Sequence, residues 1–229
     1  MKIQLLGNCS VILTTEKGKI MLDPYFSNKG NIMFRRGENV SEDYKKIDSL
    51  DGILLSHEHF DHMDLGFLKK FKGKCPLYGP IGLKGLFFKR KTVSCGDKFY
   101  LKDMEITVVK AKHVCPTVGY IIKAENKTIY FSGDTYYREF MKDIASEFSI
   151  DVALLPVTNY MPPMTMDKES LAKALEILQP KYFIPMHKDL VKRVNPNNCT
   201  VTEEELRKVM KDNIKLVYLK NGQTFDKMV

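Results

Sequence analysis

One short stretch of this 229-residue chain constrains its fold more than any other. Residues 56–62 read Ser-His-Glu-His-Phe-Asp-His, an H-x-H-x-D-H pattern that directly follows the apolar run Gly52–Leu55. Histidines this close together would repel one another when protonated, whereas neutral imidazole is the commonest protein ligand of metal ions. The pattern therefore predicts a metal-binding loop at the end of a buried strand.

The positions of the remaining histidines agree with this prediction. The chain has five histidines, and the two outside the motif follow strand-like runs at 106–111 and 182–185. An aspartate also follows an apolar run, at 128–131. Alone, such a histidine would more often be an ordinary core or surface residue, and such an aspartate a turn residue. Together with the motif they complete seven candidate ligands: His57, His59, Asp61, His62, His113, Asp134 and His187.

Seven ligands are enough for two metal positions, since each position needs about three protein ligands and room for water. In an extended loop His57 and His59 project to the same side and can chelate one ion, while Asp61 and His62 reach a second position. Asp134 is the natural bridging residue because its two carboxylate oxygens can face both ions. No histidine then remains as a general acid, so Asp61, water or a hydroxyl such as that of Tyr160 must protonate the leaving group.

The periodicity of apolar residues predicts short strands and turns in the first part of the chain and strand–helix alternation after about residue 134. Strands are expected at 2–6, 11–15, 19–22, 52–55, 77–78, 92–94, 98–101, 105–109, 119–123, 128–131, 152–155, 182–185 and 216–219. Helices are expected at 65–71, 82–89, 136–148, 171–178 behind an Asp167 cap, and 202–211 behind a Thr202–Glu205 capping box. Residues 26–46 are expected to form a long loop with a short helix.

Ligands at strand ends in both halves of the chain indicate two sheets packed face to face, with helices outside and the metals along one edge. With 44% apolar residues, the whole chain, 1–229, is expected to form a single domain. No apolar stretch approaches the roughly 20 residues that span a bilayer, so membrane insertion is not expected. The N-terminus enters a strand pattern at once, which argues against a signal peptide. Five cysteines without a C-x-x-C pair favour reduced thiols and a cytoplasmic location.

The formal net charge is +8 and has two interpretations. A positive field steers anionic small molecules towards a protein, and it also permits a nucleic-acid partner. The simpler interpretation is a lysine-rich solvated surface, because the basic residues are spread along the chain and do not alternate with aromatic residues. The sequence leaves open whether the chain forms a homo-oligomer.

The successive motifs resemble those of the metallo-β-lactamase superfamily, from Leu6-Gly7 to His187. Asp23-Pro24 and Ile184-Pro185-Met186-His187 are similar to the corresponding motifs of the compact UlaG-like metal-dependent hydrolases. The turn after the first strand reads Gly7-Asn8-Cys9-Ser10, with asparagine where those hydrolases have a histidine.

This resemblance implies an α/β (α+β) fold, the four-layer αββα sandwich. It implies that His57, His59 and His113 hold one divalent ion, that Asp61, His62 and His187 hold the other, and that Asp134 bridges them. Zinc is the expected metal, with manganese or iron as alternatives. Cys115 is a candidate soft ligand, but the nitrogen and oxygen set is complete without it, so we interpret it as an ordinary thiol.

The function that follows is hydrolysis of a small ester, lactone or phosphoester by a hydroxide that two metal ions activate, with Asp61 and Asp134 as the catalytic carboxylates. Two alternatives stay open: a nuclease or cyclic-nucleotide phosphodiesterase, and an iron-dependent enzyme of the same fold that does not hydrolyse its substrate. Weaker signals in loops predict five substrate contacts, at Asn8, Arg35, Arg36, Asn159 and Tyr160.

Overall fold

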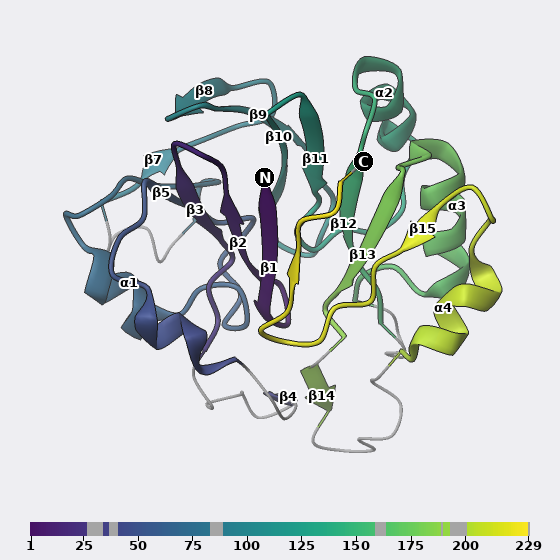
Figure 1. Ribbon diagram of the computed structural model, residues 1–229, viewed down its shortest axis with the longest axis horizontal. Helices are drawn as coiled ribbons and strands as arrows, with labels where there is room; N and C mark the ends of the chain where they lie inside the picture. Colours follow the sequence, from purple (N-terminus) through teal and green to yellow (C-terminus); the bar gives the residue numbers. More distant parts are fainter. Residues whose placement is uncertain are drawn as a thin grey trace.

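Two β-sheets packed face to face form the centre of this computed structural model (Figure 1). The structure describes residues 1–26, 34–36, 41–82, 89–158, 164–188, 190–192 and 201–228, and for 34–36 and 190–192 only the backbone. Within these residues each large sheet has seven strands.

The first sheet has the strand order β16-β1-β2-β3-β5-β6-β7. Its strands are β1 (Lys2–Gly7), β2 (Ser10–Thr14), β3 (Lys19–Leu22), β5 (Gly52–Leu54), β6 (Leu77–Gly79), β7 (Lys91–Thr92) and β16 (Thr224–Phe225). The second sheet has the order β15-β13-β12-β11-β10-β9-β8. Its strands are β8 (Lys98–Leu101), β9 (Met104–Lys110), β10 (Val118–Ala124), β11 (Lys127–Phe131), β12 (Val152–Pro156), β13 (Tyr182–Met186) and β15 (Lys215–Leu216).

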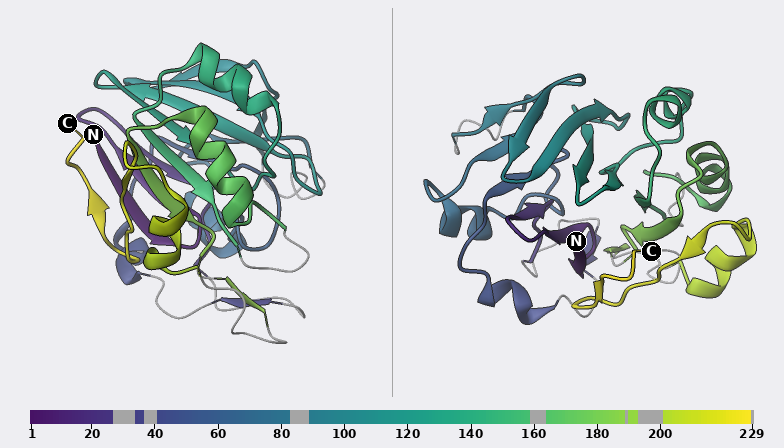
Figure 2. Two further views of the ribbon diagram at one scale, coloured as in Figure 1. Left: turned by 90° about the vertical axis from the view of Figure 1, so that its right-hand side faces the viewer. Right: turned by 45° about the horizontal axis from the view of Figure 1, so that its top comes forward.

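Helices cover the outer face of each sheet (Figures 1 and 2). Helix α1 (Leu65–Phe71) and the short 3-10 helix η1 (Glu42–Lys46) share a buried cluster with the outer face of the first sheet. Helices α2 (Phe140–Glu147), α3 (Lys168–Leu178) and α4 (Glu203–Val209) pack on the outer face of the second. The layers are therefore α, β, β, α, which confirms the predicted sandwich. No helix in the described part of the chain is long and apolar enough to span a bilayer.

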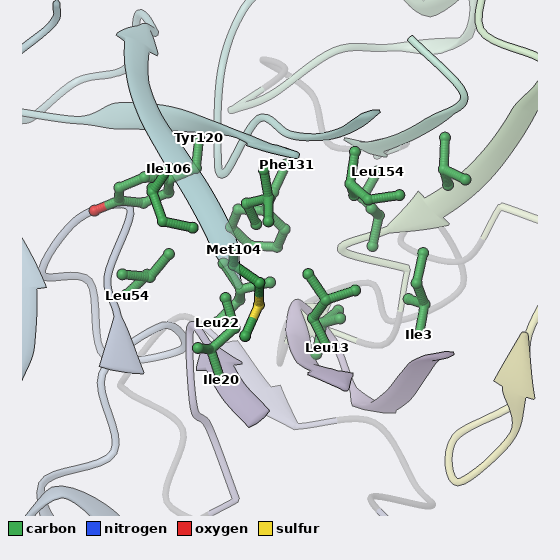
Figure 3. Packing of buried hydrophobic residues seen from close by; sticks show 14 of the residues in the cluster. Ile3, Leu13, Ile20, Leu22, Leu54, Met104, Ile106, Tyr120, Phe131 and Leu154 are labelled. Carbon is green, nitrogen blue, oxygen red and sulfur yellow. The ribbon is translucent and has the colours of Figure 1, made fainter. Parts of the chain in front are cut away.

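Alternation along the strands builds the core between the sheets (Figure 3). In β10, Tyr120 and Ile122 are buried between the sheets, whereas Ile121 belongs to the cluster beneath the helices. Side chains from both sheets meet in this core, among them Ile3, Leu13, Ile20, Leu22 and Leu54 from the first and Met104, Ile106, Tyr120, Phe131 and Leu154 from the second.

The predicted helix caps are present. Asp167 accepts a hydrogen bond from Ser170 N (2.8 Å) at the start of α3. At α4, Thr202 and Glu205 form the reciprocal capping box, with Glu205 N donating to Thr202 Oγ1 (3.2 Å). Because these bonds satisfy backbone groups that a helix start leaves unpaired, local sequence decides where both helices begin.

Several elements differ from the predictions. Helix α2 begins at Phe140 rather than 136, and Tyr136 N instead donates to Lys112 O (2.8 Å) in the neighbouring loop. Strand β15 covers 215–216 rather than 216–219. The 26–46 segment contains a strand, β4 (Phe34–Arg36), which pairs antiparallel with β14 (Leu190–Lys192). Residues 83–88, within the predicted helix 82–89, lie outside the described residues.

Candidate metal centre

The H-x-H-x-D-H loop leaves the first sheet at the carboxyl end of β5. This strand runs parallel to both of its neighbours, β3 and β6, and is buried throughout. Leu55 N extends the pairing by donating to Tyr78 O (2.9 Å). The chain then turns into the loop at Ser56, so a rigid central strand fixes where His57 begins.

The remaining candidate ligands come from the second sheet. Asp134 follows β11 by three residues, and His187 follows β13 directly. Strands β11, β12 and β13 are parallel, so their carboxyl ends lie at one edge of the sheet. His113 lies in the connection between β9 and β10. A bond from Val118 N to Ser56 O (3.0 Å) joins this connection to the motif loop of the first sheet.

A glycine allows the loops from the two sheets to meet. Gly133 precedes Asp134 and has a φ of +57°, in the left-handed region. A Cβ added at this position would lie 2.2 Å from Ser56 Cβ, far inside van der Waals contact. Any larger residue would therefore push Asp134 away from the motif histidines.

The other six predicted ligands lie around the carboxylate of Asp134. Its Oδ2 lies 3.2 Å from Nε2 of His187, 3.4 Å from Nε2 of His62, 3.8 Å from Nε2 of His113 and 4.0 Å from Nε2 of His57. Two of these four histidines come from each of the two predicted ligand sets. Asp134 thus occupies the place between two candidate metal positions.

Four overlapping groups of candidate ligands lie in this region of the described structure, and two of them contain the two predicted sets. His57, His59 and His113, together with Cys115, offer ligand atoms that all lie within 4.8 Å of one another. His59 Nδ1 is 3.2 Å from His113 Nε2. The second group is Asp61, His62 and His187, again within 4.8 Å, with His187 Nε2 3.1 Å from Asp61 Oδ2. These two groups contain the sets that the family resemblance implies, and two further groups overlap them: Cys9 with His62 and Asp134, and Asp23 with His57 and His62.

The donor atoms fit divalent ions. Among the described residues, Nε2 of His57, Nε2 of His62 and Oδ1 of Asp134 are buried polar atoms with no hydrogen-bond partner. Buried polar groups are nearly always paired, and an unpaired one costs about 1–3 kcal/mol. Cations coordinated by these atoms would remove that cost, so the chemistry of the donor set agrees with a metal centre.

The pKa values of the histidines diverge within this small volume. Burial holds the pKa of His57 well below its usual range and lowers that of His113 to about 4. Burial also acts on His187, but the carboxylates of Asp134 and Asp61 outweigh it and raise its pKa to about 10. The raised pKa favours the charged form of His187, whose charge balances that of the neighbouring carboxylates in the metal-free protein. Bound dications would take over that role and leave the imidazoles neutral.

A buried aspartate that the sequence reasoning did not select supports the second group. Asp23 Oδ2 lies 2.7 Å from Nδ1 of His62, and Ser56 Oγ donates to the same oxygen (2.5 Å). Ser56 N donates to Asp23 Oδ1 (2.6 Å). A carboxylate that is hydrogen-bonded to the ring nitrogen not bound to the metal fixes the tautomer and orientation of a metal-binding histidine. The signal in the sequence was Asp23-Pro24 directly after β3, which we noted as a motif of the family resemblance without assigning a role to Asp23.

Of the five predicted substrate contacts, one has a described side chain. Asn8 is buried, and its Nδ2 lies 3.5 Å from Asp61 Oδ2. Arg35 and Arg36 belong to β4, whose backbone pairs with Val191 and Leu190, but their side chains lie outside the described part. Asn159 and Tyr160 also lie outside the described residues. All five remain predictions.

Two comparisons decide the family. A family model described as the β-lactamase superfamily domain matches residues 19–188. A UPF0173 metal-dependent hydrolase of Pyrococcus furiosus is 30% identical over 239 residues, which cover 98% of this chain and 99% of that protein. This chain belongs to the UPF0173 metal-dependent hydrolases of the metallo-β-lactamase superfamily. A metal-dependent hydrolase is therefore confirmed at the level of the family.

Solved structures agree on the fold of this hydrolase. An isothiocyanate hydrolase from Delia radicum gut bacteria superposes with a TM-score of 0.82 at 18% identity, covering 100% of both chains. CmlA, a diiron β-hydroxylase from Streptomyces venezuelae, superposes with a TM-score of 0.75 at 13% identity, covering 98% of this chain and 53% of that one. At these identities the two structures establish the shared fold alone.

Proposed function

We propose that this metal-dependent hydrolase binds two divalent ions, expected to be zinc, and cleaves a small ester, lactone or phosphoester. His57, His59 and His113 hold the first ion, and Asp61, His62 and His187 hold the second. Asp134 bridges them. The observation that supports this most strongly is the position of Asp134 Oδ2, within 3.2–4.0 Å of Nε2 of four histidines from the two sets.

When bound, the two ions lower the pKa of coordinated water towards neutrality and polarise the oxygen of the scissile bond. Asp61 is the group in reach that can orient water and move a proton. Its Oδ2 lies beside His187 (3.1 Å) and Asn8 (3.5 Å), so the carboxylate is held in place from two sides. Oδ2 faces the ligand nitrogens of His62 and His187, so we assign the proton taken from the attacking water and returned to the leaving oxygen to the other oxygen of Asp61, Oδ1.

The buried partners of the ligands keep this arrangement rigid. Asp23 fixes the ring of His62, and Ser56 Oγ lies 2.9 Å from Nδ1 of His57. Both contacts leave Nε2 as the ring nitrogen that faces Asp134. Preorganised ligands of this kind spare the protein the cost of rearrangement during the reaction.

The test begins with metal analysis of the purified protein, followed by a screen of esters, lactones and phosphodiesters. Wild type should bind two ions per chain. Asp134→Asn should lose affinity at the second position and most of the hydrolysis, because an amide cannot neutralise two dications. Asp151→Asn is a matched control: Asp151 is also buried but precedes β12, and it pairs with Lys181 (2.8 Å). Asp134→Asn with two ions and full turnover would contradict the bridging role.

The same metal analysis separates the alternatives. Iron as the bound metal, with no turnover of any ester, would favour an enzyme that does not hydrolyse its substrate, a reaction class for which CmlA provides a precedent on this fold. Turnover of bis(p-nitrophenyl) phosphate or a cyclic nucleotide, without turnover of carboxylic esters, would favour a phosphodiesterase or nuclease. The net charge of +8 is compatible with the latter.

A further inference from the structure

The first metal position contains a fourth donor besides its three histidines. The ligand atoms of His57, His59, His113 and Cys115 all lie within 4.8 Å of one another. Cys115 is half-buried and follows His113 by two residues in the β9–β10 connection. The sequence alone gave no reason to prefer a ligand over an ordinary thiol at this position.

A second observation points into the same place. His57 is fully buried, its Nδ1 contacts Ser56, and its Nε2 has no hydrogen-bond partner among the described residues. His59 Nδ1 and His113 Nε2 also face each other at 3.2 Å. A cation between these imidazoles would give His57 Nε2 a partner and would replace the hydrogen bond between His59 and His113. The ligand atom of Cys115 lies within reach of such a cation.

We propose that Cys115 is a sulfur ligand of the ion in the first position, which therefore has a His3Cys donor set. This inference rests on the proposed metal centre. Three neutral imidazoles bring no charge to the ion, so a thiolate is the one anionic ligand there besides the bridging carboxylate of Asp134. Thiolate is a soft donor that favours zinc and other thiophilic ions over manganese or magnesium. Cys115 thereby selects the metal in the first position.

Other cysteines provide controls. Cys75 is half-buried like Cys115, and Cys95 is exposed. Within the described part of the chain neither belongs to a group of candidate ligands. Cys9 is the competitor, since it lies in a group with His62 and Asp134, although it is buried in the core between the sheets.

The experiment uses cobalt(II) as the probe. Thiolate bound to cobalt gives a charge-transfer band in the near ultraviolet, which histidine and carboxylate ligands do not give. Wild type and Cys75→Ser should show the band with two cobalt ions per chain, whereas Cys115→Ser should lose it. A second measurement needs no variant: zinc should protect Cys115 of wild type from alkylation at least tenfold, while Cys95 reacts equally with and without zinc.

The possible failures can be told apart. A wild-type chain that binds two cobalt ions without the band overturns the assignment of Cys115 but leaves the two-metal centre intact. A band that survives in Cys115→Ser and disappears in Cys9→Ser also overturns it, in favour of Cys9. A wild-type chain that binds no metal refutes the proposed centre and this inference together.

Discussion

Replacing Asp23 with asparagine tests whether a residue that touches no substrate controls the second metal position. Asp23 is fully buried and bonds to Ser56 N (2.6 Å), Ser56 Oγ (2.5 Å) and His62 Nδ1 (2.7 Å). Asparagine keeps the shape but turns one oxygen into an NH2 group. That group must face either Ser56 N or His62 Nδ1, and in both cases a charge-assisted bond is lost.

The size of the effect on metal affinity and on stability follows from the loss of this bond. A hydrogen bond to a charged group contributes about 1.5–3 kcal/mol. Removing a carboxylate behind a metal-binding histidine typically costs about 10–100-fold in metal affinity, or roughly 1.4–2.7 kcal/mol. The metal-free protein should be affected less, because burial raises the pKa of Asp23 and its charge is therefore already costly there. In Asp23→Asn we expect the metal affinity of the second position to fall about 10–100-fold. The unfolding free energy of the metal-free protein should stay within about 1 kcal/mol of wild type.

Zinc affinities of both positions can be measured by competition with a chromogenic chelator. In Asp23→Asn the second position should weaken while the first stays within about threefold of wild type, since Asp23 contacts His62 directly but is linked to His57 of the first set only through Ser56. Asp151→Asn, on the other side of the fold, should change neither affinity. Equal weakening of both positions in Asp23→Asn, or of neither, would refute this account of how Asp23 acts.

Three further predictions concern other parts of the molecule. Gly133→Ala should destabilise the protein by more than about 2 kcal/mol in chemical denaturation, because its φ is +57° and its new Cβ would lie 2.2 Å from a carbon of the motif loop; a loss under 0.5 kcal/mol would contradict this. Replacing Arg35 and Arg36 together with Ala should raise KM for the best anionic substrate more than it lowers kcat, and unchanged kinetics would leave β4 a purely structural element. The Lys168 ammonium lowers the pKa of Glu205 to about 2, so this carboxylate stabilises the fold above its ordinary pKa of 4.5, and the contribution disappears as the pH falls through about 2. Because the pair is about one-third exposed, Glu205→Gln should cost only about 1 kcal/mol at pH 7, and a cost that did not shrink in acid would contradict the assignment.

Local sequence was sufficient wherever a short segment carries its own signal. Helix α1 was predicted at 65–71 and forms over Leu65–Phe71 behind an Asp64 cap. The cap at Asp167 and the capping box at Thr202 were also correct. In these cases the deciding contacts lie within four residues along the chain, so side-chain type and spacing determine the outcome. The sandwich followed from the same reasoning, because alternation of apolar residues specifies which strand faces are buried.

Segments whose partners are distant in sequence were harder to predict. Strands β4 and β14 are three residues each and pair across more than 150 positions, and β16 is a two-residue edge strand beside β1. Elements this short carry no measurable period, so only the assembled sheets reveal them. Helix α2 began later than predicted, and Tyr136, which was expected in its first turn, donates its N–H to Lys112 O in a loop more than twenty residues away.

For the candidate metal centre too, some features follow from local sequence and others only from the tertiary structure. The sequence by itself predicted seven candidate ligands, because ligand chemistry depends on side-chain type and the H-x-H-x-D-H spacing is local. Only the tertiary structure decided that Asp134 lies among four histidines, that Asp23 supports His62, and that Cys115 joins the first group. These three relations depend on the order of parallel strands and on the close approach at Gly133, where two sheets distant in sequence come into contact.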